Sequence, residues 1–187
     1  MNITVFCGSS QPHNAQIAVA ARELGRQIAM GGHTLLYGGS NLGLMGKVSG
    51  GALEAGGTVI AVIPTFFSEE IINSQPVSEI VRVANMAERK EYLIAHSDAF
   101  VALPGGIGTL DEVMEVMVYN QLGPLRDPAH RDKPIALYNP NGFWQHFERL
   151  IEVMGQNGFY RSGQPPKYFT APTIDALLQK IIGLCVK

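Results

Sequence analysis

The stretch of sequence that decides the fold is "AFVALPGGIGTLDE", residues 99–112. Residues 99–103 are continuously apolar, as in a buried strand, and residues 109–122 have the spacing of a helix. Glycines between a strand and a helix let backbone N–H groups approach an anion, and the helix N-terminus adds partial positive charge. The joining loop therefore suggests a phosphate site, although glycines also serve tight turns that bind nothing.

The rest of the chain repeats this alternation of short apolar runs and helical segments. Strands are expected at residues 3–6, 34–37, 58–64, 79–83, 99–103 and 134–138. Helices are expected at residues 14–30, 44–55, 86–97, 109–122, 143–154 and 173–185, and loops at 66–78, 126–133 and 155–167. Apolar strands that alternate with helices form parallel sheets covered on both faces. We therefore predict one doubly wound, Rossmann-like α/β domain over residues 1–187, with ligands bound at the carboxyl ends of the strands.

Composition restricts the classes of function. The 187 residues carry a formal net charge of −2, so the overall charge does not attract nucleic acid or an anionic membrane. The two cysteines, Cys7 and Cys185, show no metal-ligand spacing, and the five histidines are scattered, so we expect neither a metal nor another cofactor. No apolar run has the length of a membrane span and the first residues do not form a signal peptide, so we expect a cytoplasmic location.

Two common nucleotide-binding motifs fail on spacing. The dinucleotide fingerprint requires Gly-x-Gly-x-x-Gly, and the third glycine is missing after Gly106 and Gly108. The nucleoside-triphosphatase loop requires Gly-x-x-x-x-Gly-Lys followed by Ser or Thr. Around Gly46-Lys47, the position for that hydroxyl residue holds Val48. The sequence therefore supports neither dinucleotide reduction nor triphosphate hydrolysis.

Glu112 allows two interpretations. Thr109 and Glu112 match the T-x-x-E capping box, in which the glutamate satisfies a backbone N–H at the helix start. Alternatively, a carboxylate one turn into the helix leans back toward the helix start, and so toward the loop and its ligand. Glu112 lies off the apolar stripe expected for this helix. The members of that stripe are Leu110, Val113, Met114, Met117 and Val118. Both interpretations stay open on these residues alone.

The helix expected at residues 86–97 provides a second observation. Asn85 is its expected N-cap, with Glu88 three residues later completing a capping box. Its core-facing stripe comprises Met86, Arg89, Lys90, Leu93, Ile94 and Ser97. Snorkelling explains one cation in such a stripe better than two adjacent ones. Because unpaired buried cations are costly, Arg89 and Lys90 should meet carboxylates or phosphate. We therefore predict that they share one cleft with Glu112 and the glycine loop.

Together these segments resemble the cytokinin riboside 5′-monophosphate phosphoribohydrolases, the "Lonely Guy" family, whose members are often mislabelled as lysine decarboxylases. The family motif P-G-G-x-G-T-x-x-E matches residues 104–112, and M-x-x-R-K matches residues 86–90. A third motif, G-G-G-x-x-G-L-M-G, matches residues 38–46 with Ser40 as the third glycine's replacement. Ala87 stands where many members carry histidine, and Asp111 where glutamate is usual. The resemblance is thinner beyond about residue 123.

The resemblance implies hydrolysis of the N-glycosidic bond of a cytokinin or adenine nucleoside 5′-monophosphate, giving free base and ribose 5-phosphate. The glycine loop would hold the phosphate, and Glu112 with Arg89 would be catalytic at the anomeric carbon, as carboxylates are in glycoside hydrolysis. The resemblance also implies a homodimer. The substrate contacts carried over are Glu70, Lys90, Gly105, Gly106, Ile107, Gly108, Thr109, Leu110 and Asp111.

Two other functions compete with this interpretation. Proteins resembling molybdenum-cofactor carriers have the same fold and a similar glycine loop, so the chain could be a non-enzymatic carrier of a nucleotide or of that cofactor. A carrier has no need of the pair Arg89 and Glu112, and their presence favours the enzyme. A pyridoxal-phosphate decarboxylase needs a Schiff-base lysine and a partner for the pyridine nitrogen. Lys90 is the only lysine near the expected site, and its neighbours suit phosphate better.

Overall fold

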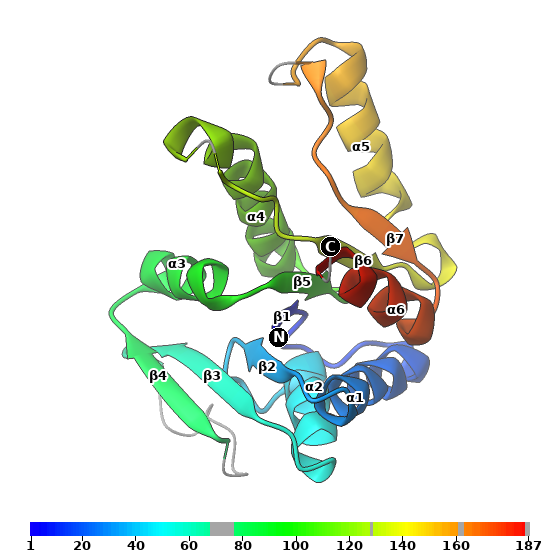
Figure 1. Ribbon diagram of the computed structural model, residues 1–187. Coiled ribbons are helices and arrows are strands. Elements are labelled where there is room, and N and C mark those ends of the chain that lie inside the picture. The colour runs from blue at the N-terminus through cyan, green and yellow to red at the C-terminus, as the bar shows by residue number, and fades with distance from the viewer. Residues whose placement is uncertain (68–76, 128, 161–162, 186–187) are drawn as a thin grey trace.

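The computed structural model describes residues 1–67, 77–127, 129–160 and 163–185. The described residues form one parallel sheet of seven strands in the order β4-β3-β2-β1-β5-β6-β7 (Figure 1). The strands are β1 (Asn2–Phe6), β2 (Thr34–Tyr37), β3 (Val59–Pro64), β4 (Glu79–Val83), β5 (Ala99–Ala102), β6 (Ile135–Tyr138) and β7 (Phe169–Ala171). The α-helices are α1 (Ala15–Met30), α2 (Gly43–Glu54), α3 (Met86–His96), α4 (Ile107–Arg126), α5 (Gln145–Gln156) and α6 (Ile174–Cys185).

Helices cover both faces of the sheet, which confirms the predicted doubly wound α/β fold. Helices α1, α2 and α6 pack on one face, and α3 and α4 pack on the other (Figure 1). Because successive strand residues point to opposite faces, Val5 belongs to the first core and Phe6 to the second. Both faces of the central strands are thus apolar, as their uninterrupted apolar sequences predict.

The order of the strands reverses between β1 and β5. From β1 the chain adds β2, β3 and β4 on one side, and then adds β5, β6 and β7 on the other. Phe6 pairs with Ala102, so β1 and β5 end side by side. The loops that follow them also touch, since a Cβ built on Gly8 would lie 3.6 Å from the Cα of Gly105. Doubly wound sheets bind ligands at such a reversal.

The largest differences from the sequence prediction are at β7 and α4. Strand β7 is not predicted, because it has only three residues and pairs with β6 at the edge of the sheet. Helix α4 starts two residues earlier and ends four residues later than the expected 109–122. The sequence Gly123-Pro124 suggests a helix end, but Pro124 lies inside the last turn, where the Asp127 N–H still donates to the Gly123 carbonyl at 3.0 Å.

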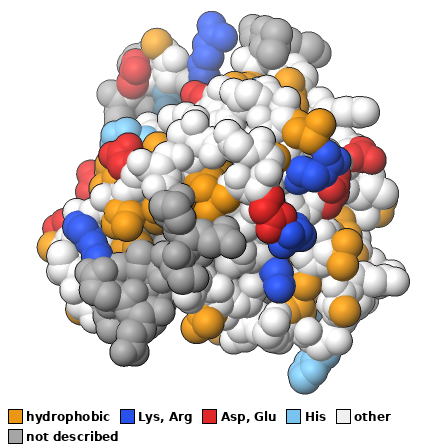
Figure 2. All heavy atoms as spheres, turned by 90° about the horizontal axis from the view of Figure 1, so that it is seen from below, with side chains coloured by type: hydrophobic (Ala, Val, Ile, Leu, Met, Phe, Trp, Pro, Cys, Tyr) orange, Lys and Arg blue, Asp and Glu red, His pale blue; other side chains and the backbone are white. Residues whose placement is uncertain are grey.

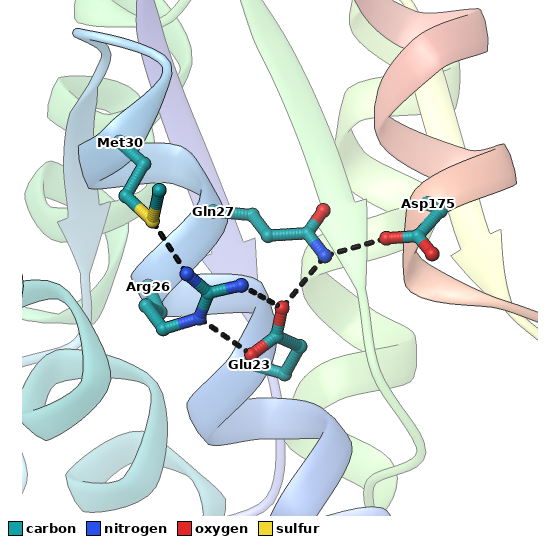
Figure 3. A network of polar contacts seen from close by, with 5 residues as sticks. All are labelled: Glu23, Arg26, Gln27, Met30 and Asp175. Atoms are coloured by element: carbon teal, nitrogen blue, oxygen red, sulfur yellow. Dashed lines mark hydrogen bonds and ion pairs between the residues drawn. The ribbon is translucent and has the colours of Figure 1, made fainter.

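Polar contacts connect α1 to α6 near the surface (Figure 3). The Arg26 guanidinium forms an ion pair with Glu23 at 2.6 Å, one turn earlier on α1. The amide of Gln27 donates to Glu23 at 2.7 Å and also to Asp175 on α6. Because the Arg26 and Glu23 side chains are 46% and 36% exposed, their ion pair adds little stability, and the hydrogen bond from Gln27 to Asp175 is the contact of this network that reaches α6.

The surface seen in Figure 2 carries mixed charge. On its described part, basic and acidic side chains lie close together and do not form a broad basic patch. The part of this face that is described therefore lacks the electrostatic footprint of a nucleic-acid-binding surface. None of the helices in the described ranges combines the length and apolarity needed to cross a bilayer.

Candidate active site

A cavity of about 570 Å³ lies where the strand order reverses. Its walls are the loop after β1, the glycine loop with the first turn of α4, and side chains from α1, α2, α3 and the segment before α5. The lining residues are 7–14, Ile17, Leu44, Met45, Met86, Arg89, Pro104, Gly105, Gly106, Gly108, Thr109, Asp111, Glu112 and Phe143. The cavity thus joins the two segments that the sequence analysis singled out.

The glycine loop and the start of α4 form one wall of this cavity. Gly106 is the N-cap of α4 and no side chain caps the helix, so the N–H groups of the first turn lack the intrahelical partners that later residues have. A Cβ built on Gly106 or Gly108 would meet no heavy atom within 4 Å, whereas one on Gly105 would lie 2.2 Å from the Thr109 hydroxyl. Packing therefore requires a glycine only at 105. The open space at 106 and 108 suits an anion that approaches the backbone closely.

The capping interpretation of Glu112 is wrong. Helix α4 begins at Ile107, which makes Thr109 a buried residue inside the first turn and not the N-cap. The capping box predicted for α3 is present in part: Asn85 accepts from the Glu88 N–H at 3.0 Å, and Glu88 accepts from the Ala84 N–H at 2.8 Å. In α4 the glutamate turns inward instead.

The carboxylate of Glu112 forms a buried ion pair with Arg89. Arg89 Nη1 lies 3.2 Å from Glu112 Oε1, and the two residues are 6% and 5% exposed. Arg89 Nε also donates to the Val62 carbonyl of β3 at 3.2 Å. This confirms that Arg89 is buried against a carboxylate. A buried pair of this kind keeps its geometry only while both partners are present, because either one alone would be an uncompensated charge.

Lys90 pairs with two carboxylates at the edge of the cavity. Its Nζ lies 3.0 Å from Asp111 Oδ2 and also forms an ion pair with Glu115. The hydrogen bond to Glu115, followed by the one to Asp111, raises the pKa of Lys90, so this side chain stays an ammonium. Asp111 lines the cavity and Lys90 does not, so the prediction that Lys90 shares the cleft with Arg89 and Glu112 is wrong, although its partner Asp111 reaches that cleft.

Burial raises the pKa values of two groups that line the cavity, Glu112 and Cys7. It raises the pKa of Glu112 to about 7, and the neighbouring Arg89 guanidinium limits that rise. Burial, together with the charge of Glu112, also raises the pKa of Cys7, so this thiol stays neutral and is a poor nucleophile. The cavity therefore contains a carboxylate that gains or loses its proton near neutral pH, which is a common property of catalytic groups.

The predicted site residues do not all line the cavity. Glu70 lies outside the described residues, Ile107 is 82% exposed, and Leu110 packs beside the core under α4. The predicted apolar stripe of α4 is also partly wrong, because Val116 is buried and Val118 is 46% exposed. The helix is turned so that Glu112 faces inward. The predicted residues that line the cavity are Arg89, Gly105, Gly106, Gly108, Thr109, Asp111 and Glu112.

The loop after β1 supplies lining residues that the list of predicted site residues does not contain. Residues 7–14 line the cavity, and the only signal for them was the small-residue stretch "CGSS" at the end of the first strand. Phe143 lines it too, from beyond β6, and no local pattern marks it. Backbone contact fixes the loop in place, since Leu44 N–H donates to the Gly8 carbonyl at 3.0 Å.

A smaller cavity of about 290 Å³ adjoins the first, over the ends of β2 and β3. Its lining includes Ser9, Met45 and Arg89, which also line the larger cavity. Ser40, the departure from the glycine motif, lines it as well. The Ser40 hydroxyl accepts a hydrogen bond from the Leu42 N–H at 3.1 Å, so the serine stabilises the turn into α2.

Neither cavity offers the groups that a metal or a Schiff base requires. Among the described residues, no group of three or more His, Cys, Asp and Glu side chains could hold a metal ion. The described lining of both cavities also contains no lysine. The charged side chains that reach the larger cavity beside the glycine loop are Arg89, Asp111 and Glu112.

The chain is similar to known proteins in sequence and in fold. Residues 45–181 match a family model described as "Possible lysine decarboxylase". The chain is 38% identical, over 96% of its length, to the cytokinin riboside 5′-monophosphate phosphoribohydrolases LOG5 of Arabidopsis thaliana and LOG of Oryza sativa subsp. japonica. These alignments cover 76% and 72% of the two relatives. The solved molybdenum cofactor carrier protein of Chlamydomonas reinhardtii superposes with a TM-score of 0.72 at 25% identity, covering 100% of this chain and 98% of the carrier.

Proposed function

The chain belongs to the family of cytokinin riboside 5′-monophosphate phosphoribohydrolases, and we propose that it hydrolyses the N-glycosidic bond of a nucleoside 5′-monophosphate. The base is adenine or a cytokinin, and the products are the free base and ribose 5-phosphate. The observation that supports this most strongly is the buried pair of Arg89 and Glu112, which lines the same cavity as the open glycine loop.

In the proposed reaction the glycine loop and the start of α4 bind the 5′-phosphate, which fixes the ribose. Glu112 then lies beside the anomeric carbon, where its carboxylate stabilises the cationic sugar or takes a proton from the attacking water. The water oxygen forms the new bond to that carbon as the bond to the base breaks, and the departing base takes up a proton. Arg89 holds the carboxylate in place and limits the rise in its pKa.

A decarboxylase is a weaker interpretation, despite the description of the matching family model. Pyridoxal chemistry starts from a lysine that forms a Schiff base. The described cavity linings contain no lysine, and Lys90 is held as an ammonium by Glu115 and Asp111. A carrier function has more support than a decarboxylase, because the likeness to a molybdenum cofactor carrier extends along the whole chain. A carrier would bind a nucleotide and release it unchanged, which product analysis detects.

Incubation with a panel of nucleoside monophosphates tests the proposed function. The panel contains AMP, isopentenyladenosine monophosphate, GMP, IMP and CMP, and released base is separated by chromatography. We expect base from at least one of the two adenine nucleotides, and the ratio of their kcat/KM values identifies the preferred base. Absence of free base from every nucleotide would refute the hydrolase.

The 5′-phosphate is expected to be essential for turnover. Its binding energy comes from the donors at residues 106–109, which have no purpose for an uncharged nucleoside. Adenosine should therefore be hydrolysed at least ~10²-fold less efficiently than AMP, as judged by kcat/KM. Gly108→Ala should raise the KM for AMP, whereas Gly183→Ala, an equally uncrowded glycine in α6, should not. Equal kcat/KM values for AMP and adenosine would show that binding of the 5′-phosphate does not contribute to turnover.

The pH dependence of kcat/KM should report the ionisation of Glu112. Its raised pKa of about 7 means that the neutral acid predominates below neutrality, so a reaction that needs the carboxylate slows as the pH falls. We expect kcat/KM for AMP to fall roughly tenfold per unit below about pH 7. The nucleotide phosphate itself titrates near pH ~6. A profile that is flat from pH 8 down to that region would contradict the role of Glu112.

We also propose that the protein is a homodimer. Apolar side chains are exposed on the outer face of α4, with Val118 at 46% and Leu125 at 65% exposure. Val118 borders a groove that also includes Ile94 and Leu122. Light scattering should give twice the chain mass, and Val118→Arg should give a monomer. Val19→Arg, at an exposed apolar position on α1, is the control that should leave the mass unchanged.

A further inference from the structure

Gly38, the first residue after β2, lies directly against the guanidinium of Arg89. A Cβ built on Gly38 would lie 1.7 Å from Arg89 Nη2 and 2.8 Å from Cζ. Both separations are far shorter than a van der Waals contact, so no side chain fits at this position while Arg89 keeps its place. The first glycine of the motif at residues 38–46 thus faces the ion pair of the proposed active site.

The backbone does not explain this glycine. Gly38 is absent from the described residues with positive φ, so its conformation is open to other amino acids. The next residue differs, because Gly39 has a φ of +83° and a Cβ on it would lie 2.2 Å from the Ile63 side chain. Position 39 needs glycine for its own conformation and packing, whereas position 38 needs it for the space that Arg89 occupies.

The guanidinium is located by neighbours on three elements. Nε donates to the Val62 carbonyl of β3, Nη1 pairs with Glu112 of α4, and Nη2 points at the Gly38 backbone after β2. The first two contacts attract the guanidinium, and the third sets how close it comes to the sheet. A methyl group at position 38 would therefore move it relative to the carboxylate of Glu112.

We propose that Gly38 is a positioning residue, whose missing side chain provides the space in which Arg89 holds the Glu112 carboxylate. Gly38 acts through Arg89 and not on the substrate. The effect on catalysis rests on the hydrolase function proposed above, but the effect on Glu112 does not. The obstructing atoms are the far end of a flexible side chain, so the fold can accept alanine by displacing the guanidinium. Alanine at position 38 should then lower catalytic activity and leave the fold stable.

Gly38→Ala tests this directly. We expect kcat for AMP to fall at least ~10-fold with KM little changed, because the phosphate donors belong to a different loop. The acid limb of the pH profile should move to higher pH, since Arg89 is the group that limits the rise in the pKa of Glu112. Gly50→Ala in α2, whose nearest neighbour would be 4.0 Å from the new Cβ, should change neither quantity. Wild-type kcat and pH profile in Gly38→Ala would overturn the proposal.

Two further measurements test the proposal even if Gly38→Ala does not fold or AMP is not the substrate. If Gly38 acts only through Arg89, adding Gly38→Ala to Arg89→Ala should cost no further activity and no further stability. That double variant should fold even if Gly38→Ala alone does not, because the obstructing side chain is gone, and a further loss in it would contradict the proposal. A carboxyl NMR titration should show a higher pKa for Glu112 in Gly38→Ala, even if AMP proves not to be the substrate. An unchanged titration would refute the positioning role.

Discussion

Replacing Glu112 by glutamine is expected to lower kcat for AMP by at least ~10²-fold while the fold stays intact. Glutamine keeps the length of the side chain and can still accept a hydrogen bond from Arg89. It cannot carry the negative charge that stabilises a cationic sugar or takes a proton from water. Binding of AMP should survive, because the proposed phosphate contacts are backbone N–H groups on α4. Steady-state kinetics, with AMP affinity from calorimetry, would measure both effects.

Glu54→Gln is the matched control for this variant. Glu54 also pairs with an arginine, Arg22, but the pair lies on the surface between α2 and α1. Its loss should leave kcat unchanged, which would show that the effect of Glu112→Gln depends on the site. Near-normal turnover in Glu112→Gln would rule out the proposed mechanism.

Arg89→Ala is expected to produce a comparable loss of turnover and, in addition, a loss of stability that depends on pH. Without Arg89 the pKa of Glu112 should rise further, because the guanidinium is the main group that lowers it. At low pH the neutral Glu112 tolerates burial. At high pH it would be an unpaired buried charge, which costs about 3 kcal/mol or more. The stability deficit should therefore grow from pH 6 to pH 9.

Urea unfolding at the two pH values would measure this deficit, with Arg22→Ala as the surface control. Turnover in Arg89→Ala should recover in part as the pH rises and Glu112 ionises. A deficit in unfolding free energy that is the same at both pH values would show that Arg89 is not the partner that keeps Glu112 charged.

The parts of the site that could be predicted from the sequence are those where a charged residue stands at a position expected to face the core. Arg89 and Lys90 fall on the predicted core stripe of α3, and the cost of burying cations required carboxylate partners; the structure buries Arg89 fully and Lys90 in part. The structure provides Glu112 for Arg89, and Asp111 with Glu115 for Lys90. The doubly wound sheet was predictable for a similar reason, because uninterrupted apolar strands can be buried only between two layers of helices.

Other features could not be predicted because they depend on contacts between distant segments. The loop of residues 7–14 joins the site only because β1 lies beside β5, and Phe143 joins it from beyond β6. The start of α4 was misplaced because Thr109 has the residue type of an N-cap, whereas the glycine before Ile107 takes that role. The need for glycine at position 38 likewise cannot be predicted from the sequence, because it depends on the contact with the Arg89 guanidinium.

The most direct test of the central claim is a product balance on AMP, with adenine measured by chromatography and ribose 5-phosphate by phosphorus NMR in the same sample. We predict that the two products appear in equal amounts as AMP disappears, and that Glu112→Gln gives neither within the same time. AMP that binds to the protein but is recovered intact would contradict the hydrolase and favour a carrier.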